Sequence, residues 1–263
     1  MNTFKQENKK KIFQSYNFDW DDNIMFMPTK IILFHKKTKQ ELPISTHEFA
    51  HVRHDVGVKG VYADYELLND SKSVYFSYRE FRDMGGENTF LPQVVETLKN
   101  SQCFGPSFPA FQEALSDQET AAHTTIITAR GHNPESLLEA IEYLQELKLV
   151  KYLPPLENIF PVSSPKINAN ASHPSEMKLS ILTSLIDKMD EKAKTTVEVP
   201  TFSGFSDDDL GTYKAVKEKL LEYAKAGRWS HVNVVLYFTG KNPERKLLTP
   251  NGYVDFENAE KVA

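Results

Sequence analysis

Residues 12–23 read IFQSYNFDWDDN, a short apolar segment that runs directly into a cluster of acidic residues. Residues 12–19 have the length and composition of a β-strand, and Asp21 and Asp22 lie in the turn that follows Asp19. In open α/β sheets, ligands bind at the carboxyl ends of the strands. An acidic turn at this place therefore favours an α/β protein with its site at the end of the first strand.

Strands and helices alternate along most of the remaining chain. Residues 124–128 (TTIIT) are β-branched and apolar, and the helix after them has Asn133 as its N-cap and Pro134 in its first turn. The other predicted elements are strands over residues 159–163, 197–205 and 232–238 and helices over residues 133–148, 172–192 and 207–226. Helices between successive strands imply right-handed crossovers, so we predict a three-layer α/β/α sandwich with a parallel, Rossmann-like sheet.

Residues 28–105 do not follow this alternation. Residues 29–45 predict a β-hairpin with a polar turn, and a short helix is expected from Thr46. We therefore predict a core domain formed by residues 1–27 and 106–263, with a small cap or flap insertion between its two parts. Because this insertion emerges just after the first acidic cluster, the selectivity for the substrate should lie in it.

A second acidic cluster, residues 206–209 (SDDD), follows the predicted strand over residues 197–205. Buried carboxylates are unfavourable unless a cation neutralises them, and Mg²⁺ prefers a few carboxylate oxygens with water and a substrate phosphate. A carboxylate that the metal leaves partly free can attack phosphorus, and a second one can protonate the leaving oxygen and then activate water. The two clusters thus indicate a site for a hard divalent cation such as Mg²⁺, at which phosphoryl transfer would be possible chemistry.

The motif FDWDDN, residues 18–23, resembles the nucleophile loop of the haloacid dehalogenase-like (HAD) superfamily, which reads Asp-x-Asp-x-Thr in its phosphatases. Three further motifs resemble that family in the same order. Thr128 looks like the hydroxyl that holds a phosphoryl oxygen, Lys178 like the lysine that neutralises the nucleophile, and residues 206–209 like the acidic metal-binding motif. Together they cover about residues 12–240.

The resemblance implies a magnesium-dependent phosphatase that hydrolyses phosphate monoesters through an aspartyl-phosphate at Asp19. Asp21 would act as the general acid and then as the general base, which favours a phosphatase over a dehalogenase. The implied catalytic residues are Asp19, Asp21, Thr128 and Lys178, the implied metal ligands Asp19, Asp21 (through its backbone carbonyl), Asp207 and Asp208, and the implied substrate contacts Thr128, Ala129 and Arg130.

The acidic motifs depart from the family pattern in two places. Asn23 stands where the family has Thr or Val, in a position that mainly shapes the turn. In the fourth motif the acids arrive later than usual, so Asp207 and Asp208 are both kept as ligands. Asp209 is alternatively the N-cap of the following helix.

Two basic residues of the predicted site also have alternatives. Lys166 competes with Lys178 for the motif lysine, and Lys178 is preferred because it lies early in the helix before the fourth strand. Arg130 either pairs with a surface carboxylate or reaches an anion of the substrate. The sequence leaves both alternatives for Arg130 open.

The segment His47-Glu48-Phe49-Ala50-His51 matches H-E-x-x-H, the zinc-binding helix of metallopeptidases. A zinc metallopeptidase is therefore an alternative function, and a non-catalytic binding protein with the HAD fold is another. Ser45 and Thr46 place His47 at the very start of a short helix, whereas the peptidase motif lies inside a longer one. A helix that is exposed to solvent or packs on the insertion is the preferred interpretation.

Composition excludes several other classes of protein. The net charge of −5 and a pI near 5.9 give no reason to expect nucleic acid or an anionic membrane as a partner. Cys103 is the single cysteine, so no internal disulfide can form. No apolar run is long enough for a transmembrane helix, and the polar N-terminus lacks the features of a signal peptide. We expect a cytoplasmic protein that acts on a phosphorylated substrate, with non-classical export left open.

Overall fold

A seven-stranded sheet lies at the centre of the protein in a computed structural model that describes residues 13–70, 75–83, 85–167, 173–195 and 200–256. In the order in which they lie side by side, its strands are β10 (Gly252–Asp255), β9 (Glu244–Thr249), β8 (Asn233–Phe238), β7 (Thr201–Asp207), β1 (Phe13–Phe18), β5 (Thr124–Thr128) and β6 (Ile159–Pro161). The strands from β8 to β6 run parallel, whereas β9 and β10 are antiparallel. The predicted α/β class with a mostly parallel sheet is confirmed. The antiparallel strands at the edge were not predicted.

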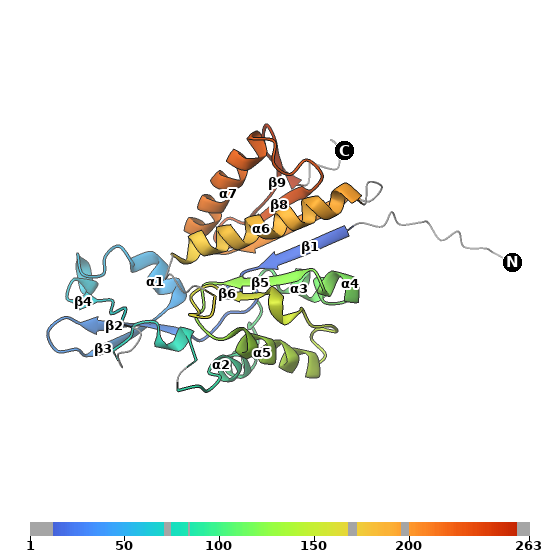
Figure 1. Ribbon diagram of the computed structural model, residues 1–263. Helices are drawn as coiled ribbons and strands as arrows, with labels where there is room; N and C mark the ends of the chain where they lie inside the picture. Colours follow the sequence, from blue (N-terminus) through green and yellow to red (C-terminus); the bar gives the residue numbers. More distant parts are fainter. Residues whose placement is uncertain (1–12, 71–74, 84, 168–172, 196–199, 257–263) are drawn as a thin grey trace.

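Helices cover both faces of this sheet (Figure 1). One face packs against α6 (Pro174–Thr195) and α7 (Leu210–Lys225), and the other against α2 (Phe90–Thr97), α3 (Phe108–Ala114) and α5 (Pro134–Glu146), with the short α4 (Gln118–Ala121) leading into β5. The alternation of β1 divides its apolar side chains between the two layers. Phe13 belongs to the core under α6 and α7, and Phe18 to the core under α2, α3 and α5. The result is the expected three-layer arrangement.

The predicted helices and strands of the core are found with shifted ends. β7 extends to Asp207, so the helix predicted from residue 207 begins only at Leu210, with Asp209 as its N-cap. Gly227 follows α7 with φ of +79°, the left-handed conformation that favours glycine after a helix. Residues 12, 172 and 196–199, where three of the predicted elements began, lie outside the described part of the chain.

The N-terminus of α5 differs from the prediction in the side chain that caps it. Asn133 occupies the N-cap position as predicted, but its side chain makes no capping hydrogen bond. The carboxylate of Asp83 accepts instead from the backbone N–H of Asn133 (2.7 Å) and from the hydroxyl of Ser136 (2.8 Å). A charged acceptor at this end also interacts favourably with the helix dipole, so a residue of the predicted insertion fastens a helix of the core.

The predicted insertion begins with a separate three-stranded sheet. This sheet has the order β3 (Glu41–Ser45), β2 (Lys30–His35) and β4 (Tyr65–Glu66), and is accompanied by α1 (Thr46–Val52) and two 3-10 turns, Gly60–Tyr62 and Arg79–Phe81. β2 and β3 form the predicted antiparallel hairpin. In Figure 1 this small sheet stands beyond the carboxyl end of β1, where the acidic turn lies. No helix within the described residues is long and apolar enough to cross a bilayer.

Candidate active site

The acidic turn after β1 is held rigidly at the centre of the sheet edge. Asp19 follows β1 directly, and its backbone N–H donates to the carbonyl of Ser206 on β7 (3.0 Å). Trp20 is fully buried and packs edge-on against Phe90 at 5.2 Å between ring centroids. Asp22 closes the turn with φ of +53°, a conformation that aspartate tolerates better than most residues.

The buried side chain of Asn23 stabilises the turn through hydrogen bonds. Its side-chain amide donates to the carbonyl of Asp19 and to the hydroxyl of Ser206, both at 2.9 Å. Its amide oxygen accepts from the hydroxyls of Ser107 (2.8 Å) and Thr239 (2.7 Å). Asn23 therefore does shape the turn, as the motif suggested. Ser107 and Thr239 were missed, because they lie 84 and 216 residues from Asn23 in sequence and no local pattern distinguishes them.

Lys178 joins the two acidic clusters. It lies in the second turn of α6, and its Nζ donates to Oδ1 of Asp19 (2.7 Å) and to Oδ2 of Asp207 (2.8 Å). All three side chains are buried, with exposed fractions of 3% for Lys178, 4% for Asp19 and 0% for Asp207. The sequence placed Lys178, Asp19 and Asp207 in one site, and the structure brings them into direct contact.

The electrostatics of this group favour an additional cation. Burial raises the pKa of Asp19 to about 8, with Lys178 opposing the shift and Asp207 adding to it. Burial likewise raises the pKa of Asp207 and, together with repulsion from Asp19 and Asp207, raises that of Asp208 well above its usual value. Burial works to lower the pKa of Lys178, but Asp19 and Asp207 outweigh it and raise that pKa. One lysine is shared among three carboxyl groups that resist ionisation.

The residues present fit a magnesium ion. Among the described side chains, Asp19, Asp207 and Asp208 form a group whose ligand oxygens all lie within 4.8 Å of one another. Oxygens around one octahedral Mg²⁺ at about 2.0–2.1 Å lie up to about 4.2 Å apart, so a small adjustment is enough. Asp209 stands apart as the N-cap of α7, where its Oδ1 accepts from the backbone N–H of Thr212 (2.6 Å). This geometry favours Asp207 and Asp208 over Asp209 as ligands.

Arg130 lies on the other side of the turn and binds Asp21. Its Nε donates to Oδ2 of Asp21 (2.9 Å) and its Nη2 to Oδ1 (2.6 Å), a bidentate pair in which the arginine is 0% exposed. The carboxylate partner of Arg130 is thus a residue of the site itself. Thr128 is buried at the end of β5, and Ala129 beside it is exposed. Since β5 lies next to β1 in parallel, Thr128 and Ala129 are at the same sheet edge as Asp19.

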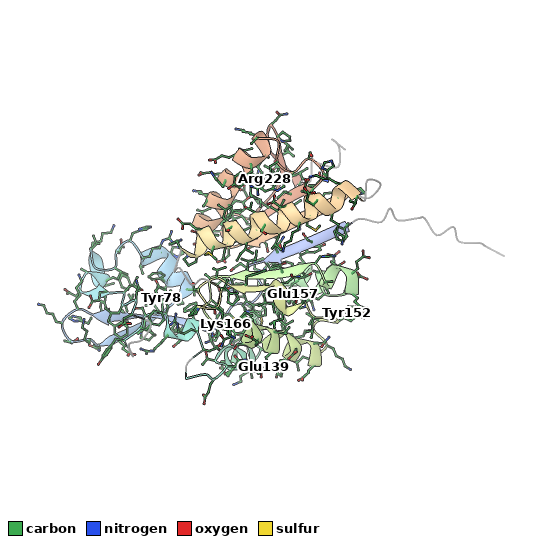
Figure 2. The ribbon with its side chains drawn as sticks, in the orientation of Figure 1. Tyr78, Glu139, Tyr152, Glu157, Lys166 and Arg228 are labelled. Atoms are coloured by element: carbon green, nitrogen blue, oxygen red, sulfur yellow. The ribbon has the colours of Figure 1, made fainter. Side chains whose placement is uncertain are left out.

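Lys166 does not reach the acidic cluster. Its Nζ pairs with the carboxylate of Glu135 at 3.1 Å, and both side chains are exposed. Figure 2 shows Lys166 near α5 and apart from α6, the helix that carries Lys178. Of the two candidate lysines, Lys178 is the one that contacts Asp19.

The H-E-x-x-H segment forms the helix α1, with Ser45 as its N-cap. Glu48 lies in the first turn, where its carboxylate accepts from the hydroxyl of Tyr62 at 2.7 Å. His51 is exposed, and the side chain of His47 lies outside the described part of the protein. Of the side chains that are described, no group of three potential metal ligands includes a histidine.

Comparison with protein-family models, with curated proteins and with solved structures finds no match to this chain. The site is therefore interpreted from its own residues, their geometry and the motifs they form.

Proposed function

We propose that the protein is a magnesium-dependent phosphatase of the HAD-like type that hydrolyses phosphate monoesters through an aspartyl-phosphate at Asp19. The observation that carries the proposal is the buried contact of Lys178 with Asp19 and Asp207 at 2.7 and 2.8 Å. This contact unites residues from β1, α6 and β7 at the edge where α/β sheets bind ligands. Lys178 fixes the orientation of the Asp19 carboxylate and offers positive charge to an incoming phosphate.

In the first step, an oxygen of Asp19 attacks phosphorus, and the bond from phosphorus to the ester oxygen breaks. The leaving oxygen takes its proton from the carboxyl group of Asp21, two residues beyond the nucleophile. Thr128, at the end of the neighbouring strand, would donate its hydroxyl to a phosphoryl oxygen. In the second step, Asp21 takes a proton from water, and the resulting hydroxide displaces Asp19 and releases inorganic phosphate.

The residues that would hold Mg²⁺ are Asp19, Asp207 and Asp208, together with the backbone carbonyl of Asp21. When bound, the ion neutralises the carboxylates and the phosphate dianion that they would otherwise repel. The carboxyl groups of Asp19 and Asp208, whose pKa values are raised, would then ionise without the penalty that burial alone imposes.

The insertion contacts both acidic loops, which supports a role in covering the site. Thr46, the first residue of α1, donates its hydroxyl to Oδ2 of Asp22 at 2.9 Å. Arg53, which ends the same helix, approaches Oδ2 of Asp209 at 4.0 Å. A substrate that reaches Asp19 would pass the residues of this insertion, so they are the proposed source of selectivity.

The test is hydrolysis of p-nitrophenyl phosphate by the purified protein with MgCl₂ and with EDTA. We expect release of p-nitrophenol only with Mg²⁺, and a phosphorylated peptide containing Asp19 after acid quenching. Asp19→Asn should abolish both signals, because the amide keeps the shape of the side chain but loses its nucleophilicity. If Asp19→Asn retained more than a few per cent of the activity, Asp19 could not be the nucleophile. Zinc found at one equivalent, with no response to magnesium, would favour the peptidase alternative.

A further inference from the structure

Arg130 makes more contacts than a single ion pair requires. Besides its two bonds to Asp21, its Nη1 donates to Oε1 of Gln93 (2.9 Å) and its Nη2 to the hydroxyl of Thr29 (2.6 Å). The guanidinium also lies over the rings of Phe90 (4.7 Å) and Phe81 (5.3 Å). Four of the five N–H groups of the arginine are thus engaged, and its side chain is fully buried. These contacts leave little capacity to bind an anion of the substrate directly.

The residues around Arg130 come from both ends of the insertion. Thr29 lies where the chain leaves the core, one residue before β2, and its hydroxyl also donates to Oε1 of Gln93 (2.8 Å). Gln93 lies on α2, where the chain has returned, and its amide donates to the carbonyl of Glu80 (2.8 Å). The carboxylate of Glu80 accepts from the backbone N–H of Lys30 (2.7 Å). The outgoing and returning segments are therefore tied to each other and to one guanidinium.

Gly131, the next residue, is fastened to the same segment. Its backbone N–H donates to the carbonyl of Phe81 at 2.7 Å. A Cβ at this position would lie 3.0 Å from the carbonyl oxygen of Ser163 and 3.5 Å from that of Phe81. The loop after β5 thus has little freedom to move independently of the base of the insertion.

We propose that Arg130 is a positioning residue that holds the Asp21 carboxylate in one orientation and couples that orientation to the position of the insertion relative to the core. The inference rests on the proposed phosphatase function of the same site. Both oxygens of Asp21 accept from one planar guanidinium, which fixes the plane of the carboxylate. Thr29 and Gln93 in turn fix the guanidinium, so a displacement of the insertion would be transmitted to Asp21.

The coupling makes a specific prediction about the two chemical steps. With an activated aryl phosphate, the leaving group needs no proton, so phosphorylation of Asp19 should depend little on Asp21. Removal of phosphate from Asp19 still needs a correctly placed base to activate water, a contribution of about 10²–10⁴-fold in enzymes generally. Loss of the bidentate contact should therefore slow the second step selectively.

The experiment compares wild type with Arg130→Lys by rapid mixing with 2,4-dinitrophenyl phosphate and MgCl₂. Lysine keeps the charge but cannot hold both carboxylate oxygens. We expect phosphorylation within about threefold of wild type and dephosphorylation slowed by about tenfold or more. The variant should then show a burst of dinitrophenolate close to one equivalent, with the phosphorylated enzyme visible by intact mass.

Arg228→Lys is a matched control, because Arg228 makes a similar bidentate pair with Asp187 (2.9 and 2.5 Å) in the α6–α7 part of the molecule (Figure 2). It should leave both steps unchanged. Gln93→Leu removes the hydrogen bond between Gln93 and Arg130 without altering Arg130 itself. Like Arg130→Lys, it should slow dephosphorylation more than phosphorylation.

Three results would overturn the inference in a protein whose wild type turns over. The first is that Arg130→Lys slows phosphorylation and dephosphorylation equally. The second is that the main effect of Arg130→Lys is a rise in KM. The third is that the rate of dephosphorylation is unchanged in both Arg130→Lys and Gln93→Leu. Failure of the proposed function looks different, because wild type and every variant would then release no dinitrophenolate in response to Mg²⁺.

Discussion

The metal-free protein should lose stability through Asp19 as the pH rises from about 5 to about 8. Burial, opposed by Lys178 and reinforced by Asp207, raises the pKa of Asp19 from 3.8 to about 8. In the unfolded chain this carboxyl group releases its proton near its ordinary value. Between the two pKa values the folded protein binds more protons than the unfolded chain, so the free energy of unfolding falls as the pH rises.

The size of the effect follows from the pKa shift. One pH unit is worth about 1.4 kcal/mol for one proton, so ionisation of Asp19 over this window removes about 3–4 kcal/mol. For a chain of this size that corresponds to about 6–16 °C in Tm. His132 acts in the opposite direction, because burial and the nearby Arg130 and Arg82 lower its pKa to about 2. Because His132 stays neutral in the folded protein, its contribution to the free energy of unfolding grows as the pH rises to about 6.5. This contribution must be subtracted from the measured change in stability.

Thermal melts of wild type and Asp19→Asn remove the contribution of His132, because the variant keeps that residue. Their difference contains the contribution of Asp19 together with the part of the raised pKa of Asp208 that repulsion from Asp19 causes. In EDTA, the Tm of wild type should fall relative to that of the variant as the pH rises. Mg²⁺ should restore wild type near about pH 8, where a concentration of about 100 times Kd adds about 2.7 kcal/mol. Near about pH 5 it should do little, because protons occupy the carboxylates. A Tm difference that is independent of pH, or equal stabilisation of both proteins by Mg²⁺, would refute the reasoning.

Three further substitutions and one control test other parts of the molecule. Asp21→Asn should slow hydrolysis of alkyl phosphates far more than that of activated aryl phosphates, measured as the ratio of kcat/KM, and equal losses would point to a structural role. Glu48→Gln should leave phosphatase activity within a few-fold of wild type, since the carboxylate of Glu48 accepts from the hydroxyl of Tyr62, a contact within the insertion. A loss of activity that zinc restores would contradict this. Gly105→Ala should lower the Tm by several degrees, because its Cβ would lie 2.4 Å from the backbone oxygen of Asn23. Gly204→Ala, whose Cβ would meet nothing closer than 3.8 Å, should not lower the Tm in the same melts.

Much of the sheet could be predicted because its signals are local. The β-branched run TTIIT and the apolar run that ends at Phe238 stand out by composition. A helix with recognisable ends, α5, follows the first run, and another, α7, precedes the second. β9 and β10 have no such signal. Their sequences, ERKLLT and GYVD, are short and partly charged. β9 pairs with the edge of β8, and β10 pairs in turn with β9.

The residues of the site likewise divide into those that the sequence could predict and those that it could not. Asp19, Thr128, Lys178 and Asp207 could be placed at one sheet edge from the sequence, because each lies at or just beyond the end of a strand or in the first turns of a helix. The partners of Arg130 could not be predicted, since Thr29 and Gln93 lie 101 and 37 residues away in sequence, one before and one after the small three-stranded sheet. Tertiary packing alone decides that a buried guanidinium faces Asp21 rather than solvent.

The strand order also determines when the acidic cluster can form during synthesis. β1 leaves the ribosome first, yet it lies in the middle of the sheet between β5 and β7, which are made much later. The contact between Ser15 and Ser203 closes a loop of 188 residues, although a loop half as long would save only about 0.6 kcal/mol of closure entropy. A nascent chain that ends before β7 carries Asp19 and Lys178 but neither Asp207 nor Asp208. The cluster is thus completed only when β7 pairs with β1.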